Sequence, residues 1–329
     1  MQKSMLGYQL LAVSRLGLGC MGMSEFYGKT DDAESMKTIH RAIELGITHF
    51  DTADCYGPLG ENERLLAKAL KGLREKVVLA SKCGMMRNPE TGEFMGVNGN
   101  AEYIKRACEA SLKRLETDYL DLFYLHRIDP NTPIEESIQA FADLVREGKI
   151  RHIGLSEVSA QTIERAHKIH PLTVIQSEYS LWHRRPEEVV LPLCESLNIG
   201  FVAHGPMGKG FLSGAIKSID TLDANDMRRD FPRFQKENIH HNLLMVEALQ
   251  DIADKRDQTP GQIALAWVLS QSDNIVAITG TRRVSHLEDN VKAANLTLTF
   301  AELEQINQRI PRDFAKGDLL PESFARFSE

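Results

Sequence analysis

Four side chains able to hold or move a proton follow the ends of short apolar runs in the sequence. Asp51 ends the first run, Tyr56 lies five residues further on, and Lys82 and His126 follow the next two runs. A phenol has a pKa of about 10, too high for an efficient acid near neutral pH, but a cation about 4 Å away would lower it by roughly three units. We therefore predict that Tyr56 donates a proton and that Lys82 lowers its pKa. Asp51 would keep Lys82 charged and oriented, and His126 would position the substrate oxygen.

The sequence lacks the other groups that commonly attack a carbonyl. It holds no His-x-His pair or carboxylate run suited to a catalytic metal, and no G-x-S-x-G nucleophile motif. A proton donor without a metal or a nucleophile needs a source of hydride, which a nicotinamide cofactor supplies. Each residue alone also fits a structural role, such as a solvated lysine or a packed tyrosine. If the four side chains converge on one rim of the fold, a role in proton transfer is favoured over four separate structural roles. No metal is expected at this site.

The loop after the seventh apolar run predicts a phosphate site. It reads Gly280-Thr281-Arg282-Arg283, and Ser285 with Glu288 predicts a capping box at the start of the next helix. Guanidinium groups and free helix N–H groups would then face one place, and a phosphate is their natural ligand. The alternative is a solvated pair of surface arginines.

These residues need a scaffold that brings the ends of many strands together. Seven mostly apolar runs alternate with amphipathic segments, as expected of parallel strands buried on both faces. With a weaker eighth run at Leu296–Thr299, they predict an α/β fold, a (β/α)8 TIM barrel with its active site at the C-terminal strand ends. The segment Leu6–Gly22 is predicted to form a short N-terminal β-hairpin closing the barrel bottom, and residues 1–329 to form one domain. The seven runs are Ile47–Asp51, Val77–Ser81, Tyr119–Leu125, Ile150–Leu155, Thr173–Gln176, Ile199–Ala203 and Ile275–Thr279.

Several helix starts are explicit in the sequence. A hydroxyl residue followed three positions later by Glu predicts a capping box, and proline is favoured at the first helical position. Gly148 is predicted to end the helix that begins at Thr132-Pro133. The motifs are Thr132-Pro133-x-Glu135, Thr259-Pro260 and Thr299-x-x-Glu302.

A doubly wound dinucleotide-binding sheet is the rival fold, because Gly17-Leu-Gly19-Cys-Met-Gly22 matches G-x-G-x-x-G. That fingerprint requires its third glycine at the start of a helix. Here helix signals resume only near Thr30, which favours a turn built from glycines.

Composition excludes several classes of protein. The 329 residues include 39 Lys and Arg against 46 Asp and Glu, a net charge of −7, without a basic run that would bind nucleic acid or an anionic membrane. The longest apolar stretch, Ile263–Leu269, is far shorter than the ~20 residues that span a bilayer. The first residues do not resemble a signal peptide. Five cysteines without a C-x-x-C pair fit neither a disulfide framework nor a zinc ribbon, so we expect a reduced, soluble, cytoplasmic protein.

Several longer motifs resemble the aldo-keto reductase superfamily from about Leu6 to Ile310. They are Gly46-Ile-Thr-His-Phe-Asp51-Thr-Ala-Asp-Cys-Tyr56-Gly57, Leu112-Lys-Arg-Leu-Glu-Thr-Asp-Tyr-Leu-Asp-Leu-Phe-Tyr-Leu-His126, Gly154-Leu-Ser156 and Gly280-Thr-Arg-Arg-Val-Ser-His-Leu-Glu-Asp-Asn290. Within the superfamily, Gly154–Ser159 and Gln176–Trp182 look most like the microbial and plant branch of perakine reductase-like enzymes.

The resemblance implies a barrel, NADPH as cofactor, and a catalytic tetrad at Asp51, Tyr56, Lys82 and His126. It implies that Ser156 and Gln176 hold the nicotinamide carboxamide, with Glu157 where many relatives carry Asn. Gly19 and Met21 would line the nicotinamide pocket, and Asp51 would also touch the cofactor. The other cofactor-binding residues that the resemblance implies are His204, Gly205, Pro206, Met207, Gly208, Lys209, Gly210, Gly280, Thr281, Arg282, His286, Asp289 and Asn290.

Two positions depart from the family pattern. Relatives usually read Ala-Tyr-Ser-Pro-Leu-Gly after the sixth strand, with the aromatic ring against the nicotinamide, where this chain reads Ala203-His204-Gly205-Pro206-Met207-Gly208. Relatives also usually carry Pro where this chain has Thr279. The first difference bears on cofactor stacking and the second on the shape of the seventh loop.

The expected function is NADPH-dependent reduction of aldehydes or ketones to alcohols, with the proton from Tyr56 and a small carbonyl compound as substrate. Two alternatives stay open. One is a cofactor-sensing regulatory subunit like the potassium-channel β subunits of the same superfamily, and the other is a metal-dependent barrel hydrolase. Substrate choice is expected to depend on the loops Met85–Gly99 and Gly210–Arg233, and the sequence says nothing about oligomeric state.

Overall fold

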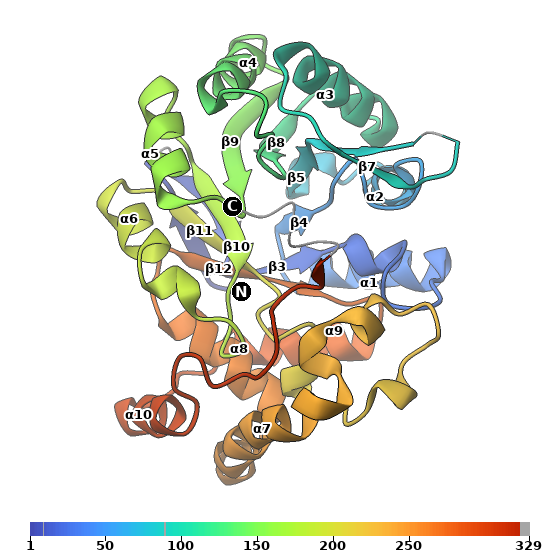
Figure 1. The fold of residues 1–329 in the computed structure, drawn as a ribbon. Helices are drawn as coiled ribbons and strands as arrows, with labels where there is room; N and C mark the ends of the chain where they lie inside the picture. The colour runs from blue at the N-terminus through green and yellow to red at the C-terminus, as the bar shows by residue number, and fades with distance from the viewer. Residues whose placement is uncertain (9, 89, 323–329) are drawn as a thin grey trace.

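A closed barrel of parallel strands forms the centre of the molecule (Figure 1). The computed structural model describes residues 1–8, 10–88 and 90–322. Around the barrel the strands follow the order β10-β11-β12-β3-β4-β5-β8-β9, which confirms the predicted (β/α)8 TIM barrel. The strands are β3 (Leu16–Gly19), β4 (His49–Asp51), β5 (Val78–Cys83), β8 (Leu120–Leu125), β9 (Ile150–Ser156), β10 (Val174–Glu178), β11 (Gly200–His204) and β12 (Ile275–Gly280).

Helices cover the outside of the barrel (Figure 1). The main apolar core lies between them and the outward-facing strand residues, and includes Phe50, Phe123 and Trp267 without any exposed surface. The helices are α1 (Asp32–Glu44), α2 (Glu61–Ala69), α3 (Ala101–Leu115), α4 (Ile134–Arg146), α5 (Ala160–Ile169), α6 (Val190–Ser196), α7 (Lys236–Arg256), α8 (Pro260–Ser270), α9 (Val284–Ala293) and α10 (Phe300–Arg309). No helix in the described ranges is long and apolar enough to cross a membrane.

The barrel strand that the sequence did not identify is Leu16–Gly19. β3 pairs with β12 through Gly19 opposite Gly280, and with β4 through Gly19 opposite Asp51. The prediction of a strand at Leu296–Thr299 is wrong, because this segment is a loop between α9 and α10. Its apolar character comes from Leu298, which packs into the main core.

A hairpin of β1 (Lys3–Leu6) and β2 (Leu11–Ser14) closes the N-terminal end of the barrel. Leu6 and Val13 pack in the barrel interior with residues near the strand starts, among them Val174 and Val276. The hairpin packs tightly against β11 at this end, because a Cβ added at Gly200 would lie 2.7 Å from Cβ of Leu6. The predicted N-terminal hairpin is thus confirmed, but it spans residues 3–14 rather than Leu6–Gly22, and the predicted segment also contained β3.

Of the three predicted capping boxes, the one at Thr299 forms and the other two do not, while the predicted helix start at Thr259-Pro260 also proves to be a capping box. Thr299 caps α10 with Glu302, and Thr259 caps α8 with Gln262 as the reciprocal partner. The capping box at Thr132 is wrong, because Pro133 is the N-cap of α4 and Thr132 Oγ1 donates to Asp129 Oδ2 at 2.8 Å. The one at Ser285 is also wrong, because α9 begins at Val284 and Arg283 is its N-cap.

Alternation along the strands turns the predicted catalytic side chains inward. Ala80 and Tyr124 pack in the barrel interior, so Lys82, two residues beyond Ala80, also faces inward. Gly154 on β9 leaves room for the Tyr124 ring, because an added Cβ would lie 2.4 Å from that ring. Packed side chains therefore fill the barrel below the strand ends, and the open space lies above them.

Candidate active site

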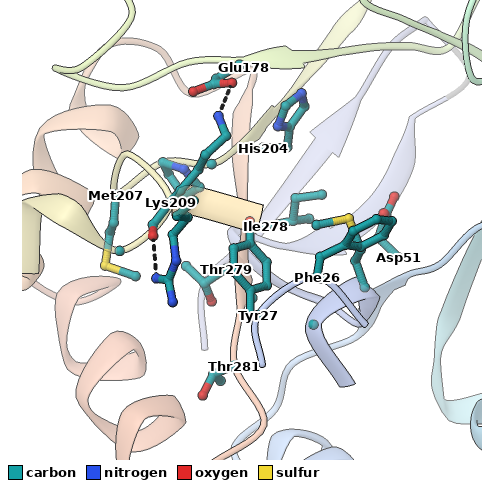
Figure 2. A pocket seen from close by; sticks show the side chains of 18 of the residues that line it. Phe26, Tyr27, Asp51, Glu178, His204, Met207, Lys209, Ile278, Thr279 and Thr281 are labelled. Carbon is teal, nitrogen blue, oxygen red and sulfur yellow. Dashed lines mark hydrogen bonds and ion pairs between the residues drawn. The ribbon is translucent and has the colours of Figure 1, made fainter. Parts of the chain in front are cut away.

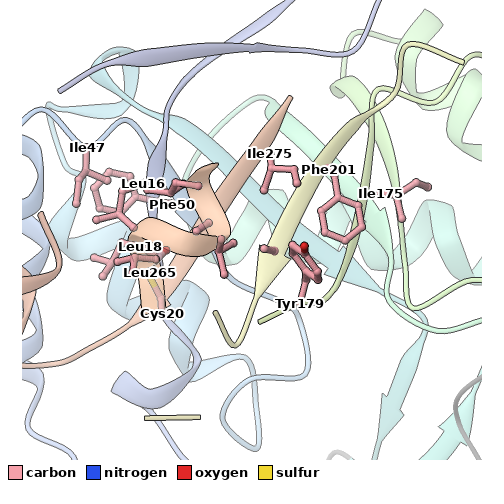
Figure 3. Close-up of a cluster of buried hydrophobic side chains, with 14 of the residues drawn as sticks. Leu16, Leu18, Cys20, Ile47, Phe50, Ile175, Tyr179, Phe201, Leu265 and Ile275 are labelled. Carbon is pink, nitrogen blue, oxygen red and sulfur yellow. Dashed lines mark hydrogen bonds between the residues drawn. The ribbon is translucent and has the colours of Figure 1, made fainter. Parts of the chain in front are cut away.

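A cavity of about 690 Å³ opens at the C-terminal ends of the barrel strands. Residues from three distant parts of the chain line it, among them Tyr27, Glu178 and Lys209 (Figure 2). The loop after β3 meets the loop after β11 beside the cavity, where the Met227 N–H donates to the Phe26 carbonyl oxygen at 2.8 Å. A segment of the chain beyond α10 contributes Leu319 and Leu320.

The predicted proton donor, Tyr56, contacts a buried ion pair between Lys82 and Asp51. Lys82 Nζ contacts Asp51 Oδ1, donates to the Thr52 carbonyl oxygen at 2.9 Å, and lies 3.3 Å from the Tyr56 hydroxyl oxygen. Lys82 has no exposed surface and Asp51 is 2 % exposed. Only Tyr56 and Asp51 of these three line the cavity, and Lys82 lies behind them.

Burial changes the proton affinity of Tyr56 in the direction opposite to the sequence prediction. Loss of water, followed by the negative charge of Asp51, raises the pKa of Tyr56 well above its ordinary value. The prediction that Lys82 would give a phenol with a lowered pKa is therefore wrong, because burial and the Asp51 charge dominate the pKa of Tyr56. The phenol is consequently protonated at neutral pH and has a proton to donate.

His126 lies at right angles to the Tyr56 ring, with the ring centres 5.7 Å apart. Burial and the nearby positive charges of Lys82 and Arg127 lower the pKa of His126 well below its ordinary value. Its imidazole is therefore neutral, with Nδ1 3.5 Å from the Cys55 sulfur. A neutral imidazole next to the phenol can hold a substrate oxygen by a hydrogen bond without competing as an acid.

Two predicted cofactor residues, Gln176 and His204, contact acidic groups at the strand ends. Gln176 Nε2 donates to Asp51 Oδ2 at 2.8 Å. His204 Nε2 lies 2.5 Å from Glu157 Oε1. Burial alone would raise the pKa of Glu157, but the hydrogen bond and charge of His204 outweigh it and lower this pKa to about 2. The residue in place of the family's usual tyrosine is thus hydrogen-bonded to Glu157.

The seventh loop forms the opposite end of the cavity. Arg282 Nη1 donates to the Tyr27 carbonyl oxygen at 2.9 Å, and Arg283 is exposed. No side chain caps the first turn of α9, and that turn carries no acidic residue. The prediction of a helix terminus with free N–H groups beside two arginines is retained, although its N-cap is Arg283 rather than Ser285.

All predicted site residues line the cavity except Lys82 and Gly208. Gly208 does not line the cavity. A Cβ added there would lie 3.1 Å from the Trp182 side chain. The predicted residues that line the cavity are Gly19, Met21, Asp51, Tyr56, His126, Ser156, Glu157, Gln176, His204, Gly205, Pro206, Met207, Lys209, Gly210, Gly280, Thr281, Arg282, His286, Asp289 and Asn290.

Sequence reasoning missed several other lining residues, including Phe26, Tyr27, Arg127 and Glu178. Phe26 and Tyr27 lie in a loop whose position depends on β3, which the sequence did not reveal as a strand. Arg127 and Glu178 could have been found, since Arg127 follows His126 directly and Glu178 lies two residues beyond Gln176 on the same face of β10.

The two cysteines next to predicted site residues are buried. Cys55 is 3 % exposed and Cys83 has no exposed surface. Burial, followed by the negative charge of Asp54, raises the pKa of both thiols. Their role as small apolar side chains is thus favoured over a reactive one.

Comparisons with known proteins point to one family. The sequence profile described as "Aldo/keto reductase family" matches residues 15–310. A probable aldo-keto reductase from Glycine max is 43% identical over 310 residues, which cover 93% of this chain and 88% of the soybean protein.

Comparison with solved structures points to the same family. The glycerol dehydrogenase of Gluconobacter oxydans is 29% identical, with a TM-score of 0.85 over 94% of this chain and 96% of its own. An aldo/keto reductase from Klebsiella pneumoniae, solved in complex with NADP and acetate, is 26% identical, with a TM-score of 0.75 over 98% of this chain and 100% of its own.

Proposed function

The chain belongs to the aldo/keto reductase family, and on that basis we propose that it reduces aldehydes or ketones to alcohols with NADPH. The observation that carries this proposal is the buried Asp51–Lys82 pair, whose ammonium lies 3.3 Å from the Tyr56 hydroxyl at the edge of a large cavity. The narrower assignment to the perakine reductase-like branch stays a prediction.

The residues of the cavity fit the parts of NADPH. Arg282, Arg283 and the uncapped first turn of α9 offer positive charge and N–H donors suited to phosphate. Gly19 and Met21 also border the cavity, and Met21 packs against the apolar cluster that contains Tyr56. When bound there, the nicotinamide would supply the hydride that none of the side chains can provide. The Klebsiella protein was solved with NADP, which supports this cofactor.

Tyr56 would protonate the oxygen of the substrate. As the carbonyl carbon gains hydride, its oxygen gains negative charge and accepts the hydroxyl proton of Tyr56. The resulting phenolate would lie beside the Lys82 ammonium, which is fixed by Asp51 and the Thr52 carbonyl oxygen. Lys82 would therefore act by stabilising the phenolate as it forms, although burial keeps the resting phenol protonated.

His126 and Gln176 would hold the reacting groups in place. The neutral His126 ring can bind the carbonyl oxygen next to Tyr56. Gln176 restrains the second Asp51 oxygen, so that the carboxylate keeps one orientation toward Lys82. Water has little access to Lys82 and Asp51, and this strengthens each of these electrostatic interactions.

The proposal is tested by mixing purified protein with NADPH and a panel of aldehydes and ketones, and following the loss of NADPH absorbance. We expect carbonyl-dependent oxidation of NADPH with formation of the matching alcohol. Tight NADPH binding with no turnover of any compound would favour the regulatory-subunit alternative. Turnover that requires an added metal and no NADPH would favour the hydrolase alternative.

A further inference from the structure

We propose that the carbonyl substrate carries an anionic group, such as a carboxylate, and that Arg127 binds it beside Tyr56. This inference rests on the proposed function and adds the chemical class of the substrate. It starts from a cation at the strand ends that forms no ion pair with any described carboxylate.

Arg127 follows His126 directly and lines the cavity half-buried. Its Nη1 atom donates to the His126 carbonyl oxygen at 3.0 Å and lies 3.4 Å from Ser156 Oγ. Both partners are uncharged, and no carboxylate among the described residues forms an ion pair with Arg127. The guanidinium is thus held at one nitrogen, and Nε and Nη2 form no hydrogen bond with the described residues.

The acidic groups at this end of the cavity are already paired. Asp51 contacts Lys82, and Glu157 lies 2.5 Å from His204. Glu178 lies 2.5 Å from Lys209. The charge of Arg127 lowers the pKa of Glu157, yet no carboxylate in the described ranges forms an ion pair with the guanidinium. A half-buried guanidinium of this kind can bind an anionic ligand by charge-assisted hydrogen bonds.

The proposed cofactor phosphates do not fill this role. They would lie against Arg282, Arg283 and the start of α9, which form the opposite end of the cavity, and a nicotinamide ring carries no negative charge. Arg127 instead lies close enough to the reacting groups for its charge to lower the pKa of His126. The remaining candidate for the missing anion is the substrate.

The cavity wall next to Tyr56 indicates the polarity of the rest of that substrate. Tyr56, Cys55 and Met85 form a small buried apolar cluster, with Phe26 and Phe94 packed against it. These residues line the same cavity as Arg127. A carbonyl compound with an apolar body and a carboxylate would match both surfaces, whereas a sugar would leave the apolar wall uncovered.

The test compares each acid with its own neutral ester, so that shape is nearly constant. We would measure kcat/KM with NADPH for 4-carboxybenzaldehyde against methyl 4-formylbenzoate, and for 4-oxobutanoate against its methyl ester. The wild type is expected to favour the acid in at least one pair. Arg127→Gln should lower the acid-to-ester ratio of kcat/KM in that pair by about 10- to 150-fold, the usual value of a charge-assisted hydrogen bond. Arg127→Lys should keep part of the preference.

A charge-matched control uses Arg146→Gln. Arg146 lies exposed on α4 and pairs with Asp143, so its replacement changes the net charge equally and should leave the acid-to-ester ratio unaltered. Added salt should reduce the wild-type preference because part of the site faces solvent.

Calorimetry provides a readout that does not need turnover. The carboxylate alcohol product, 4-(hydroxymethyl)benzoate, should bind the NADPH-saturated wild type at least about tenfold more tightly than it binds Arg127→Gln. Equal kcat/KM for acid and ester in both wild-type pairs, or equal loss on both in Arg127→Gln, would overturn the substrate proposal while leaving carbonyl reduction intact. Absence of turnover with every ester and acid would instead count against the proposed function, and the binding comparison would then decide the role of Arg127.

Discussion

At the scale of single residues, the Lys82 ammonium determines what Tyr56 can do. It contacts Asp51, the Thr52 carbonyl oxygen and the Tyr56 hydroxyl. The Lys82 side chain itself has no exposed surface. The type and order of these residues could be predicted from the sequence, but the direction of the Tyr56 pKa could not. That direction depends on burial and on the Asp51 charge, and both follow from the folded geometry.

Cofactor choice is also a property of single residues. Arg282→Ala should weaken NADPH binding by about 10- to 150-fold, because a charge-assisted bond to the 2′-phosphate is typically worth ~1.5–3 kcal/mol. NADH lacks that phosphate and should lose far less affinity. Titration of both nucleotides by fluorescence quenching measures the difference.

Arg283→Ala serves as the comparison, because Arg283 is exposed and we assign the 2′-phosphate to Arg282, so Arg283→Ala should cost NADPH less affinity than Arg282→Ala. Arg282 also donates to the Tyr27 carbonyl oxygen. Equal weakening of NADPH and NADH in Arg282→Ala would mean that the variant only loosens the loop after β3.

The buried thiols give a third prediction at this scale. All five cysteines are buried, and the pKa values of Cys55 and Cys83 are raised. Iodoacetamide at pH 8 should therefore leave activity intact and modify neither residue in the native protein, while unfolded protein is labelled at both. Mass spectrometry of the labelled peptides checks this. Rapid loss of activity that NADPH prevents would show that Cys55 or Cys83 is exposed.

At the scale of elements, strands flanked by helices were predictable and the first barrel strand was not. The runs that end at Ser81 and Leu125 are mostly apolar, which is the pattern of a buried parallel strand. β3 has only four residues, and two of them, Gly17 and Gly19, give a turn-like pattern. Its position is set by barrel closure between β12 and β4, a long-range constraint absent from local sequence.

Helix capping gives a matched prediction about stability. Thr299→Ala should lower the free energy of unfolding by about 1 kcal/mol, because the Thr299 side chain accepts the Glu302 N–H at the start of α10. Ser285 has the same apparent motif but does not cap α9, so Ser285→Ala should change stability by less than about 0.5 kcal/mol. Urea unfolding of the two variants compares them directly, and equal losses would contradict the assigned caps.

At the scale of the whole molecule, one cavity collects residues from nearly every strand end and from three long loops. The strand-end residues could be predicted because a barrel places all C-terminal ends on one rim. Phe26, Tyr27 and Leu320 could not, since they depend on how loops far apart in the sequence cross the opening. Local patterns carry no information about such crossings.

Filling this cavity should stabilise the entire fold. NADPH at 100 times its Kd should add about 2.7 kcal/mol to the free energy of unfolding, which corresponds to a rise in Tm of about 4 °C for a chain of this length. Differential scanning calorimetry with increasing NADPH measures this rise. A Tm that stays constant up to millimolar NADPH would contradict the proposed cofactor site.

The central claim is that Tyr56 gives the proton in a site where NADPH gives the hydride. The most direct measurement is the single-turnover rate of NADPH oxidation by Tyr56→Phe with a saturating aldehyde, alongside NADPH affinity measured by fluorescence. Removing one oxygen keeps the ring, so NADPH should bind within about threefold of the wild type, while the rate should fall by at least about 10²–10⁴-fold, the usual contribution of a general acid. A variant that binds NADPH and turns over near the wild-type rate would contradict the assignment of Tyr56.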